Sequence, residues 1–198
     1  MSTAQQPAAL PFYTIGHSTR SIEDFVALLR AADVALVVDI RSVARSRRNP
    51  QYNADVLAGQ LAPHGIGWER IPELGGLRGR SKQVAADING FWENDSFHNY
   101  ADYALSADFH KGFEQLLALG RERRLAVMCA EAVWWRCHRR IVADYLLAHG
   151  ESVFHLMGSD RIEPAKLTAG ARIEAPGRLV YPRQPKTGTG KGAEAGPA

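Results

Sequence analysis

One segment of the chain, residues 125–140, holds most of the side chains that could carry out chemistry. They are Cys129, Glu131, Arg136, His138 and Arg139. The apolar run that ends at Cys129 is typical of a buried strand, and the amphipathic run from Arg136 to His149 is typical of a helix. A thiol at a strand end, close to a helix N-terminus and to several cations, favours a thiolate or a bound anion. We therefore predict a polar site at the end of a sheet.

Four residues are candidates for catalysis at this site. They are Glu131, Glu73, Cys129 and His17. Carboxylates and imidazoles near strand ends can transfer protons, and a thiol whose pKa is lowered can act as a nucleophile. Each also has a structural alternative: a packed thiol, a solvated or capping carboxylate, or a histidine that binds the backbone in a turn. Asp39 and His138 are predicted to support the site.

Arginine side chains predict that the ligand is an anion. The candidates are Arg41, Arg45, Arg47, Arg48, Arg136 and Arg139. Arginine grips phosphate in bidentate fashion, and Tyr52, at the end of the first arginine cluster, can stack on a base. The alternative for residues 41–52 is a solvated basic loop that pairs with acidic neighbours.

We predict no metal and no cofactor. Cys129, Cys137, His138 and His17 could in principle surround a zinc ion, but no close Cys-x-x-Cys or His-x-x-x-His pair is present. Cys137 is expected on the core face of its helix, in line with Ile141. No Walker loop and no dinucleotide fingerprint occurs, and the spacing from Cys129 to Arg136 does not match a phosphatase-type cysteine loop.

The order of the predicted elements indicates an α/β fold. Strands are expected at residues 12–15, 34–39, 67–71, 125–129 and 152–156, and helices after Ser21, after Asn53 as far as about Pro63, at one or two places between residues 97 and 121, and from Arg136 to His149. This alternation predicts a single domain over residues 11–182 with an open, mostly parallel sheet of about five strands flanked by helices. His17, Asp39, Glu73 and Cys129 each follow a strand, so we expect them at one mouth of that sheet.

Composition sets broad limits on the kind of protein. The chain has 198 residues, of which 45% are hydrophobic, and a formal net charge of +3. Residues 1–10 and 183–198 lack apolar side chains to bury and are expected to be disordered. Two cysteines, no long apolar run and no secretory pattern predict a cytoplasmic protein without a membrane partner. Oligomeric state is not predicted.

Four motifs in sequence resemble the bacterial "domain of unknown function 488" family. They are residues 13–18 (Tyr-Thr-Ile-Gly-His-Ser), residues 39–41 with 45–52, residues 72–76 (Pro-Glu-Leu-Gly-Gly), and residues 128–131 with 137–139. The resemblance covers roughly residues 12–158 and departs at Ala44, where proline is expected. It implies a fold and the place of a polar site, but it supplies no reaction.

These observations favour an enzyme that acts on a phosphate-bearing substrate, a nucleotide or a nucleic acid. It would be a hydrolase or a transferase in which the arginines hold the anion and Glu131 or Glu73 moves a proton. The alternative is a non-catalytic nucleic-acid or nucleotide-binding module that uses the same arginines. Cys129, Glu131 and His17 together favour the enzyme, because binding alone requires none of them.

Overall fold

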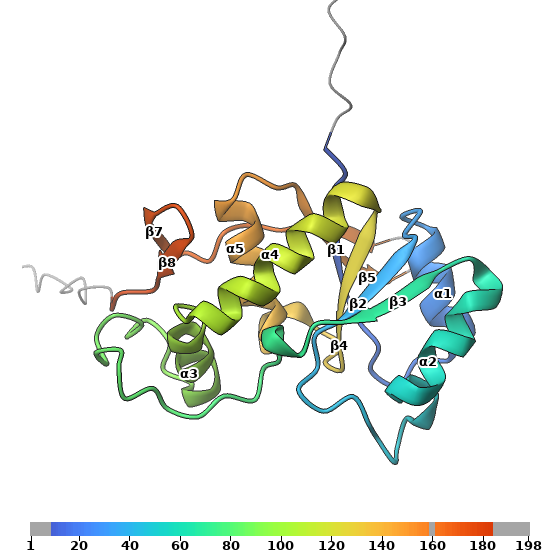
Figure 1. The fold of residues 1–198 in the computed structure, drawn as a ribbon, viewed down its shortest axis with the longest axis horizontal. Helices are drawn as coiled ribbons and strands as arrows, with labels where there is room; N and C mark the ends of the chain where they lie inside the picture. The colour runs from blue at the N-terminus through green and yellow to red at the C-terminus, as the bar shows by residue number, and fades with distance from the viewer. Residues whose placement is uncertain (1–8, 159–160, 184–198) are drawn as a thin grey trace, which may run out of the picture.

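A six-stranded sheet runs through the computed structural model, which describes residues 9–158 and 161–183 (Figure 1). Its strands are β1 (Phe12–Gly16), β2 (Leu36–Asp39), β3 (Gly67–Arg70), β4 (Leu125–Cys129), β5 (Val153–Gly158) and β6 (Arg161–Pro164). The order is β3-β2-β4-β1-β5-β6, and all neighbours are parallel except β5 and β6. The predicted single-domain α/β fold with a mostly parallel sheet is confirmed.

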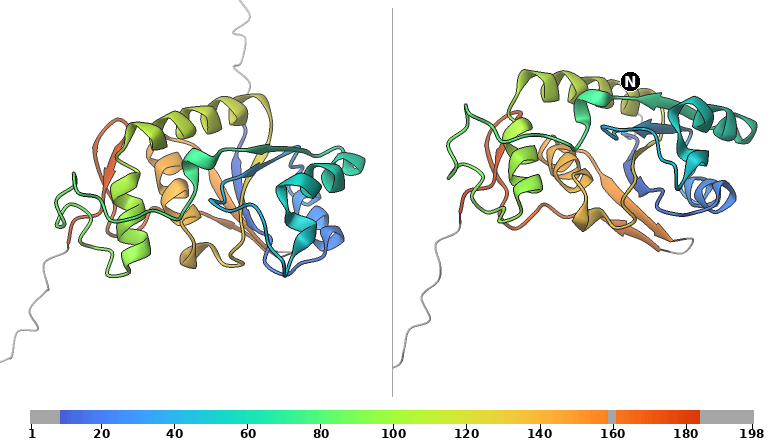
Figure 2. Two further views of the ribbon diagram at one scale, coloured as in Figure 1. Left: turned by 60° about the horizontal axis from the view of Figure 1, so that its bottom comes forward. Right: turned by 90° about the horizontal axis from the view of Figure 1, so that it is seen from below.

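Helices cover both faces of the sheet. They are α1 (Ile22–Arg30), α2 (Ala54–Leu61), α3 (Asp95–Tyr103), α4 (Ala107–Glu122) and α5 (Arg139–Ala148). One apolar core joins the sheet to α1 and α2, and a second joins its other face to α3, α4 and α5. Figure 2 shows the two groups of helices on opposite sides of the strands. A short hairpin, β7 (Arg172–Ala175) and β8 (Arg178–Val180), lies near α5.

The chain moves across the sheet from β1 through β2 to the edge strand β3, and then returns through β4 to β5. The connections from β1 to β2 and from β2 to β3 pass through α1 and α2 on one face, whereas the connections through α4 and α5 pass over the other face. The loops that leave β2 and β4, which are neighbours, therefore diverge and open a crevice at the carboxyl ends of these strands. Open α/β sheets place their ligands at such a switch point.

Alternation along the strands assigns each strand-end side chain to one face. Val127 belongs to the core under α4 and α5, and Cys129, two residues later, continues on that face. Val37 and Ile15 belong to the core under α1 and α2, so Asp39 and His17 continue on the opposite face. The ends of β1, β2 and β4 thus share one edge of the sheet, but Cys129 faces the side opposite to His17 and Asp39.

Local signals explain most element boundaries. The Ser21 hydroxyl accepts a hydrogen bond from the backbone N–H of Asp24 at the start of α1. Past α2, Gly65 adopts a left-handed conformation that stops a short 3₁₀ turn at residues 62–64. One or two helices were predicted between residues 97 and 121, and the structure has two there, α3 and α4.

Several expectations differ from the structure. Helix α5 begins at Arg139 rather than Arg136, because residues 134–136 form a separate 3₁₀ turn. Strands β6, β7 and β8 were not expected: all three are short and antiparallel, and β6 and β7 are largely exposed, whereas Leu179 and Val180 of β8 are buried. The predicted disordered ends fall almost entirely on residues 1–8 and 184–198, outside the described residues. In the described chain, every helix is too short or too polar to cross a membrane.

Candidate functional site

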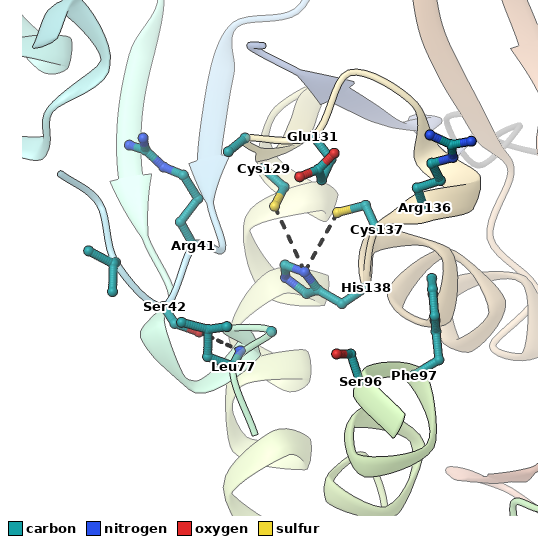
Figure 3. Close-up of a pocket in the computed structure, with 13 residues that line it drawn as sticks. Arg41, Ser42, Leu77, Ser96, Phe97, Cys129, Glu131, Arg136, Cys137 and His138 are labelled. Carbon is teal, nitrogen blue, oxygen red and sulfur yellow. Dashed lines mark hydrogen bonds between the residues drawn. The ribbon is translucent and has the colours of Figure 1, made fainter. Parts of the chain in front are cut away.

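A cavity of about 350 Å³ opens at the carboxyl end of β4. Its walls come from the loop after β2, the loop after β3, the start of α3 and the segment that joins β4 to α5. Cys129, Cys137 and His138 line it together with Glu131 and Arg136 (Figure 3). The cavity thus occupies the crevice that the switch point creates.

Two thiols and one imidazole converge in this cavity, and we call them the sulfur–imidazole cluster: Cys129, Cys137 and His138. The Nδ1 atom of His138 lies 3.8 Å from the sulfur of Cys129 and 3.6 Å from the sulfur of Cys137. All three ligand-type atoms lie within 4.8 Å of one another. Figure 3 shows both sulfur atoms directed at the imidazole. Thiolate and imidazole are ligands that zinc prefers, so the cluster could hold a metal ion.

The imidazole of His138 is held from three sides. Its Nε2–H donates to the backbone carbonyl of Ile40, 3.2 Å away, because a carbonyl can only accept. The ring of Tyr100 packs edge-on at 4.9 Å. A Cβ atom on Gly76 would overlap the imidazole, so the loop after β3 approaches the ring as only glycine allows. These contacts direct Nδ1 toward the sulfurs.

The two thiols differ in acidity. Burial alone raises the pKa of Cys137, but hydrogen bonds with Cys129 and His138 and the charges of His138 and Arg139 outweigh burial and hold that pKa well below its usual value. The hydrogen bond to Cys137, together with burial, raises the pKa of Cys129. Cys137 is therefore the more acidic thiol of the pair, and its contacts favour the thiolate form.

Arg139 supplies the counter-charge to this thiolate. Its side chain is 1% exposed, and its Nε–H and its backbone N–H donate to the sulfur of Cys137 over 3.4 and 3.5 Å. Nη2 donates to the carbonyl oxygen of Glu131 at 2.6 Å. Within residues 9–158 and 161–183, no carboxylate lies within 4.0 Å of this guanidinium. Since a buried cation needs an anionic partner, the thiolate of Cys137 fills that role.

A second polar network adjoins the cavity at Arg41 and extends to the α1 and α2 face of the sheet. Arg41 is 4% exposed and binds Asp39 in bidentate fashion, with distances of 2.9 and 2.6 Å. It also donates to the backbone carbonyl of Tyr52 at 2.6 Å and to Nε2 of His17 at 3.2 Å. Four of the five guanidinium N–H groups are thus used, so Arg41 mainly braces the loop after β2.

His17 belongs to this bracing network. Its Nδ1–H donates to the carbonyl of Ser18 at 2.9 Å, which leaves Nε2 as the acceptor for Arg41. The ring stacks on Tyr52 with 4.1 Å between centroids. Burial, with a smaller contribution from the charge of Arg41, lowers the pKa of His17 to about 4. His17 is therefore neutral near pH 7 and is bound at both nitrogens.

The sequence-predicted residues fall into two groups. Cys129, Glu131, Arg136, His138 and Arg41 line the cavity, and Arg139 lies directly behind it against Cys137. The other candidates are not part of its lining: His17, Asp39, Glu73, Arg45, Arg47 and Arg48. Arg45, Arg47 and Arg48 are exposed on the loop between β2 and α2, where Arg45 pairs with Asp55 at 3.5 Å.

Glu73 follows β3 but does not reach the cavity. It lies in the 3₁₀ turn at residues 72–74. Its side chain packs so closely against Gly112 of α4 that a Cβ atom on Gly112 would be only 2.7 Å from the Cβ of Glu73. Its backbone carbonyl accepts hydrogen bonds from Tyr103 and Arg78. In the segment after β3, Gly76 lines the cavity and Glu73 does not.

Sequence reasoning missed the role of Cys137. The expected helix from Arg136 would have turned this thiol into the core, but residue 137 is extended and precedes α5, so the thiol faces the cavity. The adjacent pair Cys137-His138 before a helix was the available signal. The apolar wall was also missed: Val43, Leu77 and Phe97 come from loops and from the first turn of α3.

Comparison with known proteins identifies the family to which the chain belongs. Neither curated proteins nor solved structures provide a match. A family model described as "Domain of unknown function DUF488" matches residues 21–146, which is more than half of the chain and includes every segment that lines the cavity. The protein therefore belongs to the DUF488 family.

Proposed function

We propose that this protein is an enzyme that acts on a phosphate-bearing substrate bound in the cavity, either a mononucleotide or one nucleotide of a nucleic-acid strand. One observation carries the proposal: a single cavity joins an apolar wall, an unpaired arginine and the sulfur–imidazole cluster. Its volume of about 350 Å³ is at the small end of the range of about 300–1,000 Å³ for ligand pockets. That size suits one nucleotide better than a duplex.

The apolar wall fits a flat, weakly polar group such as a base. Val43 is 62% exposed and Leu77 is 77% exposed, although both are large apolar side chains at the edge of the cavity. Phe97 adds an aromatic ring from α3. Exposed apolar side chains that gather at one concave surface favour ligand binding, and bases stack well on such groups.

Arg136 is the side chain best placed to hold the phosphate. It lies on the cavity wall and is exposed, and in the described chain no carboxylate lies within 4.0 Å of its guanidinium. Arg41, by contrast, is committed to Asp39, Tyr52 and His17. A free guanidinium can bind phosphate in bidentate fashion.

The sulfur–imidazole cluster favours catalysis over binding alone. Binding a nucleotide needs stacking and charge, which Leu77, Phe97 and Arg136 provide. It does not need a buried thiolate aligned with an imidazole and a buried arginine, an arrangement that costs free energy to desolvate. Glu131, on the same cavity wall, is in place to transfer a proton.

Ligand binding tests this proposal directly. The four nucleoside monophosphates, the matching nucleosides and inorganic phosphate would be compared by calorimetry at low salt. We expect a nucleoside monophosphate to bind more tightly than its nucleoside, and the Arg136→Ala variant to lose that difference. Arg121→Ala, an exposed arginine near the end of α4, is the matched control. If no phosphate-bearing compound binds, or if binding never leads to turnover detected by chromatography, the proposed enzyme is wrong.

A further inference from the structure

We propose that the sulfur–imidazole cluster is a metal site, in which the sulfurs of Cys129 and Cys137 and Nδ1 of His138 bind one zinc ion, with the fourth position open to the cavity. The metal site itself stands on geometry alone. Only its contact with a substrate rests on the function proposed above.

Two of the three separations in the cluster, those from the imidazole to each sulfur, match tetrahedral zinc, and the third lies within 4.8 Å. With Zn–S of about 2.3 Å and Zn–N of about 2.05 Å, the S···N edge of a tetrahedron is about 3.6 Å. The observed S···Nδ1 distances are 3.8 Å for Cys129 and 3.6 Å for Cys137. An ion would therefore fit between these atoms with little movement of the side chains.

The imidazole is prepared for this role. Because Nε2–H donates to the carbonyl of Ile40, Nδ1 is the nitrogen that faces the two sulfurs, and its lone pair would bind the metal ion once any proton on it is released. Histidines that bind metals usually donate their other N–H to a carbonyl or a carboxylate in this manner. Tyr100 and Gly76 pack against the ring and restrict its rotation.

Hydrogen bonds at both sulfurs would stabilise the thiolate forms, which metal binding itself requires. The backbone N–H and Nε–H of Arg139 both donate to Cys137, and the backbone of Glu131 forms a hydrogen bond with Cys129. Two thiolates and a divalent cation are together neutral, and the buried Arg139 adds one positive charge that a bound anion in the cavity would balance. Thiolate sulfurs are soft ligands, and they bind zinc in preference to magnesium or calcium.

The number of ligands distinguishes the kind of site. A structural zinc ion has four protein ligands, whereas a catalytic zinc ion has three and keeps one position for water or substrate. Among the described residues the cluster has three members, and all three line the cavity. Glu131 lines the same cavity, where it could accept a proton from a water molecule on the metal.

Metal binding is measured without any substrate. The full chain, purified with a chelator and a phosphine reductant and then freed of the chelator, would be titrated with Zn²⁺ and, as a spectroscopic probe, with Co²⁺. We expect one ion per chain, with thiolate-to-cobalt charge-transfer bands and the intense visible bands of tetrahedral cobalt. Cys137→Ser and His138→Gln should each weaken binding roughly 100-fold or more. His64→Gln, a histidine outside the cavity, should bind as the wild type does.

The outcomes separate this inference from the proposed function. Cobalt spectra without thiolate bands, or a stoichiometry that survives Cys137→Ser and His138→Gln in folded protein, would overturn the metal site. Circular dichroism establishes folding, and the wild-type spectrum remains decisive if one variant fails to fold. Zinc bound at the cluster with no nucleotide binding supports the metal site and refutes the substrate. Nucleotide binding by a protein that takes up no metal does the reverse.

Discussion

The imidazole of His138 donates its Nε2–H to the carbonyl of Ile40 over 3.2 Å. This bond joins the segment before α5 to the end of β2, so two parts of the chain that are 98 residues apart in the sequence position the ring. Its direction also decides the chemistry of the ring, because it leaves Nδ1 free for the two thiols. The imidazole and the sulfurs therefore act as one unit.

The first prediction concerns the order in which the thiols react. In metal-free, reduced protein at neutral pH, Cys137 should be alkylated by iodoacetamide before Cys129, because its pKa is lowered while that of Cys129 is raised. Peptide mass spectrometry over time measures both rates. His138→Ala should slow the reaction of Cys137, whereas His64→Gln should leave it unchanged. Faster labelling of Cys129 would contradict the assignment.

Glu131 should affect turnover more than binding. Glu131→Gln keeps the size of the side chain but removes its capacity to transfer protons, so we expect roughly 100-fold lower kcat with nearly unchanged affinity. Steady-state kinetics on the nucleotide identified by calorimetry measures both quantities. Glu122→Gln, an exposed glutamate at the end of α4, is the control. Full activity in Glu131→Gln would remove this residue from the mechanism.

The exposed arginines of the loop after β2 should matter only for longer ligands. Because Arg47 and Arg48 are not part of the cavity lining, replacing both with alanine should leave mononucleotide affinity unchanged. If a nucleic-acid strand extends across this loop, the same variant should weaken oligonucleotide binding. The slope of log affinity against log salt concentration should also fall, by the amount that corresponds to about two phosphate contacts. Fluorescence anisotropy at several salt concentrations distinguishes these cases. A large loss of mononucleotide binding would show that the loop reaches the site.

Gly76 should tolerate no side chain. In Gly76→Ala the new methyl group would overlap the imidazole of His138, so we expect a loss of about 1–3 kcal/mol in the free energy of unfolding, together with weaker metal binding. Gly79→Ala is the matched control, since nothing lies within 4 Å of its added Cβ. Urea denaturation measures both variants. Equal stability of the two would indicate that the imidazole can move aside freely.

Stability should fall in mild acid because of His155. Burial lowers the pKa of His155 to about 4 from 6.5, and the charge of Arg139 contributes. Its pKa is lower in the folded chain than in the unfolded chain, so its stabilising contribution is complete above pH 6.5 and is lost as the pH falls toward 4. Between pH 7.5 and pH 5 this one group should cost about 2 kcal/mol.

Urea denaturation of His155→Gln at both pH values isolates this effect. The variant loses the stacking of Trp134 on the imidazole, which lies 4.4 Å away, so its stability should be lower at every pH. Its dependence on pH between these values should nevertheless be smaller than that of the wild type. A parallel pH dependence in the two proteins would show that His155 titrates normally in the folded chain.

The sheet was predictable because its strands carry strong local signals. The run Leu125–Cys129 is buried at every residue, and β2 is likewise buried throughout. The antiparallel strands β6 to β8 were not predictable, because they have only three or four residues each and their pairing depends on tertiary contacts rather than on an apolar pattern. Tertiary context, rather than local propensity, decides such elements.

The site was predictable in place but not in detail. Cys129 and His138 were expected near one edge of the sheet, and strand ends establish that much. The face of each side chain depends on where the strand begins, and a shift of one residue reverses it. Whether Cys137 entered the core or the cavity likewise depended on a helix start three residues later than expected, and helix boundaries are uncertain by about that much.

Alternate residues of β2 and β4 face opposite sides of the sheet. Residues that hold the loop after β2 in place therefore lie on one side, and the sulfur–imidazole cluster lies on the other. The pair Asp39–Arg41 stabilises one side, and the wall formed by Val43, Leu77 and Phe97 shapes the other. Substitutions in that wall can alter which ligand fits without disturbing the salt bridge that holds the loop. If the wall binds a ligand as proposed, relatives of this protein could take different ligands while they keep the same scaffold, and the wall is then the region in which to compare them.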